Sequence, residues 1–347
     1  MKANQFNKRV LVTGSYGYIA SHVILELLEK GYEVYGVDNN SGQMKVVLDG
    51  VTYYDLDIRD TKGINRLFSQ IHPHAVMHFA GLKAVGESMT DPGKYMANNI
   101  SGTITLLNAM SNSGCCNNFI FSSSAAVYGI PLATPISELD QLDPINVYGY
   151  TKLMVEKLLP WYKRTKGLNY INLRYFNAVG YDPKGRITGI DKSPNNLMPI
   201  IMDYLRGKRS KLTVFGSDYP TRDGTCERDY VHVTDLAKAH VLALEKLMNP
   251  KDTEVSTEFN LGTNKGLTVK ELLQEVATVV AEDYKGKWDV KYSVEENRPG
   301  DPAKLVADSR RAQEELEWES TELSQPKQFI KTTIDAYIRA GKLNYKV

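Results

Sequence analysis

The 347-residue sequence has few cysteines, no long apolar run and almost no net charge, and each shortage excludes a class of protein. Its three cysteines, two of them adjacent at Cys115 and Cys116, form neither a disulfide framework nor a zinc-binding spacing. No apolar run approaches the roughly 18 residues of a membrane-spanning helix, and the first residues lack the apolar core of a signal peptide. A formal net charge of +1 creates no overall field toward nucleic acid or a membrane surface. These absences predict a cytoplasmic protein that binds small molecules, with no nucleic acid or membrane partner.

Histidines are also scarce, and three of the six lie close together at His72, His74 and His78. A metal site would need further ligands, and no cysteine or carboxylate pattern completes the set. We therefore expect no metal, and we interpret these residues as a loop that enters a strand.

Short β-rich runs alternate with helical segments through the first half of the chain. A helix is predicted over Ser21–Lys30, because Val23, Ile24, Leu27 and Leu28 share one face and Gly31 follows as a stop. Strands are predicted at Arg9–Thr13, Glu33–Val37, Thr52–Tyr54, Ala75–Phe79, Asn118–Ser122 and Asn169–Tyr175. This alternation predicts an α/β fold built on a Rossmann-type, doubly wound parallel sheet.

The regular alternation ends near Ala178. Loops rich in glycine, proline and asparagine follow, which indicates a second, smaller α/β domain for a substrate. We expect a dinucleotide-binding domain over 1–178 and a substrate domain over 179–347, with 229–261 returning partly to the first domain.

A glycine-rich turn lies between the first strand and the first helix. Gly14, Gly17 and Ala20 allow a tight turn whose backbone N–H groups can approach a pyrophosphate at the helix N-terminus. Asp38 follows the second strand, where a carboxylate accepts hydrogen bonds from a ribose and repels a 2′-phosphate. No arginine in Asn39–Ser41 could neutralise such a phosphate, so the pattern predicts NAD rather than NADP. An aspartate that merely caps a turn is the alternative.

Tyr148 and Lys152 are four residues apart on a predicted helix and therefore share a face. Ser124 lies 24 residues upstream, beyond a strand, at the edge where open α/β sheets bind ligands. An ammonium about 4 Å from a phenol supplies on the order of 4 kcal/mol at an effective dielectric near 20, which would bring a tyrosine pKa close to neutrality. We expect Lys152, together with oxidised NAD, to hold Tyr148 as a phenolate base while Ser124 positions a substrate hydroxyl. A solvated pair on a helix surface is the alternative.

Several longer blocks make the pattern more specific. They are HFAGLKAVGES (His78–Ser88), FSSSAAVYG (Phe121–Gly129), LRYFN (Leu173–Asn177), NNLMP (Asn195–Pro199) and the run from Phe215 to His232 that ends in RDYVH. In order and spacing these blocks resemble the UDP-galactose 4-epimerase family, within the extended short-chain dehydrogenase/reductase superfamily, from Val10 to about Trp318. The resemblance implies an isomerase that interconverts UDP-glucose and UDP-galactose through transient oxidation at sugar carbon 4 with bound NAD. It also implies a homodimer.

The resemblance assigns residues to three roles. A catalytic role is implied for Ser124, Tyr148 and Lys152. Contacts to NAD are implied for Gly14, Tyr16, Gly17, Tyr18, Ile19, Asp38, Asn39, Asp57, Ile58, Phe79, Ala80, Gly81, Lys83, Asn98, Ser122, Tyr148, Lys152 and Tyr175. Contacts to the UDP-sugar are implied for Ser124, Asn177, Asn196, Leu197, Thr213, Phe215, Arg228, Tyr230, Arg298 and Asp301.

Some positions depart from the family pattern. Ser15 and Ala20 replace glycines of the dinucleotide loop, and Ala126 and Ala178 replace other residues near the substrate. These changes leave Ser124, Tyr148 and Lys152 in place, so they bear on rate and specificity. Leu305 aligns with a residue whose bulk selects for or against N-acetylated sugars, and its intermediate size leaves that selection open.

Three other functions are open to such a chain. A 4,6-dehydratase needs an acid/base pair beside the serine, where this chain has Ala125 and Ala126. An epimerase of another UDP-sugar, such as a pentose or N-acetylhexosamine pair, would keep every catalytic residue. A catalytically silent NAD-binding module would be expected to lose Tyr148 or Lys152.

Cys226 lies within the expected substrate loop, and we interpret it as a small apolar filler.

Overall fold

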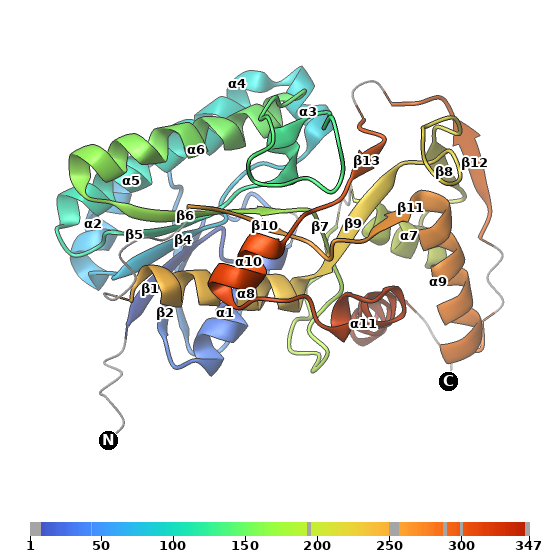
Figure 1. Cartoon of the computed structure of the whole chain (residues 1–347). Helices are drawn as coiled ribbons and strands as arrows, with labels where there is room; N and C mark the ends of the chain where they lie inside the picture. Colours follow the sequence, from blue (N-terminus) through green and yellow to red (C-terminus); the bar gives the residue numbers. More distant parts are fainter. Residues whose placement is uncertain are drawn as a thin grey trace.

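The computed structural model describes residues 8–42, 44–192, 196–249, 257–286, 290–298 and 301–343. In this part of the chain seven parallel strands form the central sheet, in the order β10-β6-β5-β4-β1-β2-β3 (Figure 1). They are β1 (Arg9–Thr13), β2 (Glu33–Asp38), β3 (Val51–Asp55), β4 (Ala75–His78), β5 (Asn118–Ser122), β6 (Asn169–Tyr175) and β10 (Glu258–Leu261). The order runs outward in both directions from the β1–β4 pair, which confirms the predicted doubly wound sheet.

Helices cover both faces of this sheet (Figure 1). Along β1, Val10 and Val12 pack into one hydrophobic cluster and Leu11 into another, because successive side chains of a strand point to opposite faces. The first cluster includes side chains of α1 (Tyr18–Glu29) and α8 (Val233–Leu247), and the second includes α2 (Thr61–Ile71), α5 (Gly102–Ser113) and α6 (Val147–Lys166).

A second, smaller α/β part contains its own hydrophobic cluster. Its strands form one sheet of order β11-β9-β13, with β7 paired to β9, and a two-stranded sheet β12-β8. The elements are β7 (Asn177–Val179), α7 (Leu197–Leu205), β8 (Leu212–Phe215), β9 (Glu227–His232), β11 (Gly266–Thr268), α9 (Val269–Asp283), β12 (Tyr292–Glu295), β13 (Lys304–Leu305) and α11 (Pro326–Arg339). The helix α10 (Arg310–Leu316) packs instead into the cluster of the first part, through Ala312 and Leu316. We propose a boundary between residues 178 and 179, which falls within β7, with α8 and β10 belonging to the first domain.

The first helix begins earlier than the sequence indicates. α1 starts at Tyr18 rather than at Ser21, because Gly17 is its extended N-cap residue and the helix follows directly from the glycine turn. This early start places the backbone N–H groups of the first turn immediately beside the loop.

The connection from β2 to β3 is unusual for a parallel pair. Within 39–50, where all residues but 43 are described, no helix forms. The ring of Tyr16 stacks on that of Tyr53 with centroids 5.0 Å apart, and the Lys45 ammonium lies 4.4 Å from the Tyr16 ring centroid. Met44 and Val46 are buried in the hydrophobic cluster of the second part. The loop thus links the two parts beside the carboxyl end of β2.

The three neighbouring histidines each have a structural role. His72 ends α2 in the left-handed conformation, with φ of 44°. The His74 ring accepts the Arg9 N–H at 2.9 Å. The buried His78 ring lies between the hydroxyls of Thr13 and Thr103, at 2.7 and 2.8 Å.

None of the helices in the described part combines the length and apolar character of a membrane span.

Candidate active site

The glycine turn after β1 packs closely against the end of β4. Gly14 has φ of +67°, and a Cβ there would lie 2.7 Å from the Ala80 nitrogen, so a side chain would have no room. Gly17 donates its N–H to the Gly14 carbonyl at 2.9 Å and caps α1. The compact turn leaves the N-terminus of α1 facing the carboxyl edge of the sheet, where an anionic pyrophosphate is favoured.

Two aspartates follow β2 and β3. Asp38 accepts the N–H groups of Tyr16 and Asn40, at 3.2 and 2.9 Å, and burial raises its pKa. Asp57 accepts the Asn39 amide at 2.8 Å and a two-point contact from Arg59, which holds its pKa well below the usual range. The carboxylates therefore lie at the same edge, and Ile58 beside them is buried.

The segment after β4 connects this edge to α6, the helix that carries the predicted catalytic residues Tyr148 and Lys152. The Phe79 ring packs on His240 with centroids 4.9 Å apart, and the Ala80 N–H donates to the Thr13 hydroxyl at 3.2 Å. A Cβ on Gly81 would lie 3.5 Å from the Lys152 ammonium. The backbone here lies directly beside Lys152, which was predicted to be catalytic.

Asn99 is a residue that sequence reasoning missed. Its side chain accepts the Leu82 N–H at 2.8 Å, and its amide donates to the Leu82 carbonyl and the Thr151 hydroxyl, both at 3.0 Å. It therefore ties the segment after β4 to α6. The predicted neighbour, Asn98, donates to the Asn99 side chain. Of the other predicted NAD residues, Lys83 is exposed and lies 3.9 Å from Asp191.

The start of α6 places Tyr148 beside Ser124. Asn146 caps the helix by accepting the Gly149 N–H at 2.8 Å. A Cβ on Gly149 would lie 2.5 Å from the Ala126 carbonyl oxygen, so glycine is what allows α6 to approach the turn after β5. The side chains of Tyr148 and Ser124 are hydrogen-bonded to each other. The structure thus brings together two of the three predicted catalytic residues.

Lys152 lies one turn further along α6, with 6% of its surface exposed. Its ammonium donates to the Ser122 carbonyl at 2.7 Å and lies 5.9 Å from the Tyr148 ring centroid. Burial lowers the pKa of Lys152 to about 8. The Ser122 hydroxyl is in turn hydrogen-bonded to the Tyr175 hydroxyl, so these predicted residues form one contiguous group.

The expectation that Lys152 together with oxidised NAD holds Tyr148 as a phenolate stays a prediction, and the protein groups alone do not ionise this tyrosine. Burial raises the pKa of Tyr148, and the hydrogen bond from Ser124 offsets that rise only in part. The lysine ammonium is directed at the Ser122 carbonyl, and removal from water penalises both charged forms. Without a further positive charge nearby, Tyr148 stays a neutral phenol at neutral pH.

The second part contributes an open pocket of about 710 Å³. Phe215 and Arg298 line it, and the guanidinium lies over the aromatic ring, 3.8 Å from its centroid. Thr213, also predicted, lies two residues before Phe215 on β8. An aromatic face and a cation in one pocket suit a base joined to a phosphate.

Arg228 and Asp301 are paired through a charge-assisted hydrogen bond, and both were predicted to hold the sugar nucleotide. Cys226 is buried, as an apolar filler would be, and burial raises its thiol pKa. The thiol also has a hydrogen-bonding contact with Arg228. The interpretation of Cys226 as a small apolar filler stays a prediction.

The remaining predicted substrate residues lie elsewhere in the second part. Asn196 is at the N-cap position of α7 without a capping bond from its side chain, Leu197 is the first residue of that helix, and Asn177 begins β7. Tyr230 is 4% exposed, and its ring stacks on Phe329 with centroids 5.9 Å apart. Asn195, which begins the NNLMP block, lies outside the described residues.

Comparison with known proteins places the chain in a family. Residues 10–262 match the model of the NAD dependent epimerase/dehydratase family. A UDP-glucose 4-epimerase of Halalkalibacterium halodurans is 44% identical over 311 residues, which is 89% of this chain and 90% of that protein. One of Bacillus subtilis is 44% identical over 322 residues, or 90% of this chain and 92% of that protein.

Comparison with solved structures leads to the same family. A UDP-glucose-4-epimerase from Stenotrophomonas maltophila, with bound NAD and formylated UDP-arabinopyranose, superposes with a TM-score of 0.88 at 37% identity, covering 97% of this chain and all of that one. The chain thus belongs to the NAD dependent epimerase/dehydratase family. The relatives and the solved structure described above are UDP-glucose 4-epimerases, which confirms the resemblance found in the sequence blocks.

Proposed function

We propose that this chain is an isomerase that interconverts UDP-glucose and UDP-galactose with a tightly held NAD. The observation that carries the proposal is the grouping of Tyr148, Ser124 and Lys152 at the carboxyl end of β5. A sugar hydroxyl placed there would meet a phenol, a serine hydroxyl and a buried ammonium at once.

The carboxyl edge of the first sheet fits a dinucleotide. A side chain at Gly14 would fill the turn that the pyrophosphate needs, and Asp38 stands where a ribose hydroxyl would be bound. Gly81 leaves the backbone open next to Lys152. When bound, NAD supplies a hydride acceptor, a positive charge beside Tyr148 and, on the return step, the hydride itself.

The residues of the chain would act on the sugar in a defined order. Tyr148 removes the proton of the hydroxyl on sugar carbon 4 as that carbon is oxidised, and Ser124 holds the hydroxyl in place. The 4-keto sugar then turns about its bond to the diphosphate and presents its other face. Tyr148 returns the proton as the carbon is reduced, and the configuration at carbon 4 is inverted.

The UDP group would be anchored at a distance from this chemistry. Phe215 offers an aromatic face to the base, and Arg298 and Arg228 offer guanidinium groups to the diphosphate. Binding energy from this remote anchor holds the nucleotide while the sugar stays free to turn.

The proposal predicts two measurable events when purified protein is mixed with UDP-glucose. The absorbance of reduced nicotinamide should appear transiently, and chromatography should resolve a mixture of UDP-glucose and UDP-galactose. UDP-xylose and UDP-N-acetylglucosamine serve as parallel substrates, because Leu305 lies partly buried at the edge of the site. Bound NAD with no conversion of any of these sugars would instead indicate a silent binding module.

We also propose that the protein forms a homodimer through α6. Tyr150 and Trp161, 44% and 62% exposed, lie eleven residues apart and thus on one face of the helix. Exposed aromatic side chains on one helix face are typical of a protein interface.

Trp161→Glu is expected to weaken association at least about tenfold, because a carboxylate would be buried without a partner. Analytical ultracentrifugation measures this, and Lys163→Glu, which is exposed on the opposite side of α6, is the matched control. Equal dissociation of both variants, or a monomeric parent protein, would contradict the dimer.

A cytoplasmic location completes the proposal and is supported by three unpaired thiols, at Cys115, Cys116 and Cys226.

A further inference from the structure

A buried ion pair lies one helical turn beyond Lys152, between α6 and β6. Three contacts join Glu156 and Arg174, at 3.0, 3.2 and 2.6 Å, and the side chains are 4% and 3% exposed. Removing two charges from water is costly, and such a pair stabilises a fold little better than apolar residues would. Its position beneath the catalytic residues points to a role beyond stability.

Glu156 is attached to the turn that carries the serines. The Ser123 hydroxyl donates to the Glu156 carboxylate at 2.5 Å. Ser123 lies between Ser122, whose carbonyl accepts from Lys152, and Ser124, which is hydrogen-bonded to Tyr148. A single carboxylate therefore fixes the turn on which both catalytic hydrogen bonds depend.

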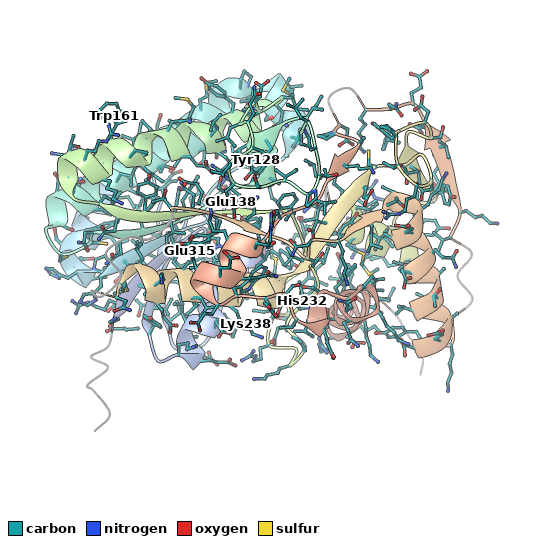
Figure 2. All side chains as sticks on the ribbon, in the orientation of Figure 1. Tyr128, Glu138, Trp161, His232, Lys238 and Glu315 are labelled. Atoms are coloured by element: carbon teal, nitrogen blue, oxygen red, sulfur yellow. The ribbon has the colours of Figure 1, made fainter. Side chains whose placement is uncertain are left out.

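Arg174 orients that carboxylate from the other side. Its guanidinium also donates to the Tyr128 hydroxyl at 2.9 Å and to the Glu138 carbonyl at 3.3 Å, and Tyr128 donates to Asn260 at 2.7 Å. Tyr128 and Glu138 lie between α6 and α10 (Figure 2). The pair is thus held rigidly between the sheet and the catalytic helix.

The groups that face Lys152 show how the Glu156 carboxylate affects the charge state of this lysine. Burial and the nearby ammonium lower the pKa of His78, at the end of β4, to about 3, so this ring is neutral. Burial raises the pKa values of Tyr148 on α6 and Tyr175 on β6, so both are neutral phenols. The Glu156 carboxylate raises the pKa of Lys152 against the effect of burial.

We propose that Glu156, oriented by Arg174, is a positioning residue that fixes the Ser122–Ser124 turn against α6 and keeps Lys152 protonated. The inference rests on the proposed function, because it assumes that charged Lys152 is needed for turnover.

The test is the pH dependence of kcat for UDP-galactose conversion by the NAD-loaded enzyme. Activity should fall as the pH rises through the pKa of Lys152. Glu156→Gln removes the anion and leaves the Arg174 cation, so the midpoint of this basic limb should move down by roughly one pH unit. Arg174→Met removes the opposing cation and should move it upward, and the double variant should return it close to the parent.

A second readout is independent of turnover. The ¹³C NMR signal of the labelled Lys152 side chain, assigned by its loss in Lys152→Met, should titrate with the same shifts. Glu138→Gln is the matched control, since this carboxylate belongs to the same cluster but binds the Asn260 N–H and should leave the midpoint unchanged. Thermal unfolding verifies that each variant is folded, and Arg174→Met replaces Glu156→Gln if the latter does not fold.

The outcomes separate the two proposals. A uniform loss of kcat with an unmoved midpoint and an unmoved NMR titration would reduce the pair to a structural role and overturn the inference. Full activity of Lys152→Met would overturn the proposed function instead, whatever the lysine titration shows in the Glu156 variant.

Discussion

Replacing Tyr148 with phenylalanine is expected to lower kcat by about 10³-fold, because proton transfer by a positioned group contributes typically 10²–10⁴-fold. The ring would remain and only its hydroxyl would be lost, along with the hydrogen bond to Ser124. Loss of that bond costs about 1 kcal/mol of folding free energy, so the protein should stay folded and keep its NAD. Chromatography of the nucleotide sugars over time gives kcat, and thermal unfolding gives the stability.

Tyr150→Phe is the matched control for this prediction. Tyr150 lies on the same helix, two residues away, but its ring is 44% exposed, and the same hydroxyl deletion there should leave kcat unchanged. Comparable turnover by Tyr148→Phe and Tyr150→Phe would mean that a different group takes the proton.

Alanine at Gly14 is expected to have the second large effect, the loss of bound NAD. The left-handed φ of +67° costs a side chain about 1–2 kcal/mol, and a Cβ only 2.7 Å from the Ala80 nitrogen adds about 1–3 kcal/mol of overpacking. A shift of the turn relieves the overlap and displaces the amides that face the pyrophosphate. A total near 3 kcal/mol would weaken NAD retention about a hundredfold. Nicotinamide released after denaturation, measured per protomer, reports the retained fraction.

Gly31→Ala separates backbone strain from this close approach. Gly31 also has a positive φ, of +80°, but no atom lies within 4 Å of its would-be Cβ. The strain of about 1–2 kcal/mol should therefore lower stability and leave NAD in place. If Gly14→Ala and Gly31→Ala retain NAD equally, the turn after β1 does not form the dinucleotide site.

The sequence anticipated that Tyr148, Lys152 and Ser124 lie together better than it anticipated their electrostatics. Tyr148, Lys152 and Ser124 could be selected because a helical spacing and a strand end place them at one edge. The direction of the Tyr148 pKa could not, because it depends on burial and on the Ser122 carbonyl that the lysine ammonium contacts. Both are products of packing between α6 and β5.

Residues that act through others escaped the sequence for a similar reason. Asn99 looks like an ordinary polar residue beside Asn98, yet it binds the backbone of Leu82, seventeen residues away. Glu156 belongs to no quoted block, and Arg174 lies within the LRYFN block without a role being assigned to it. Their meeting depends on the distance between an α6 turn and β6, which no local pattern encodes.

The sequence by itself determined the alternation of strands and helices, the glycine turn, the acidic strand end and the family resemblance, because these depend on local periodicity and on residue types at fixed spacing. Tertiary structure alone decided which charged groups are shielded from water and which face one another. Coulomb interactions and desolvation depend on distances through space, so the charge state of Lys152 and Tyr148 follows from how α6 packs on the sheet.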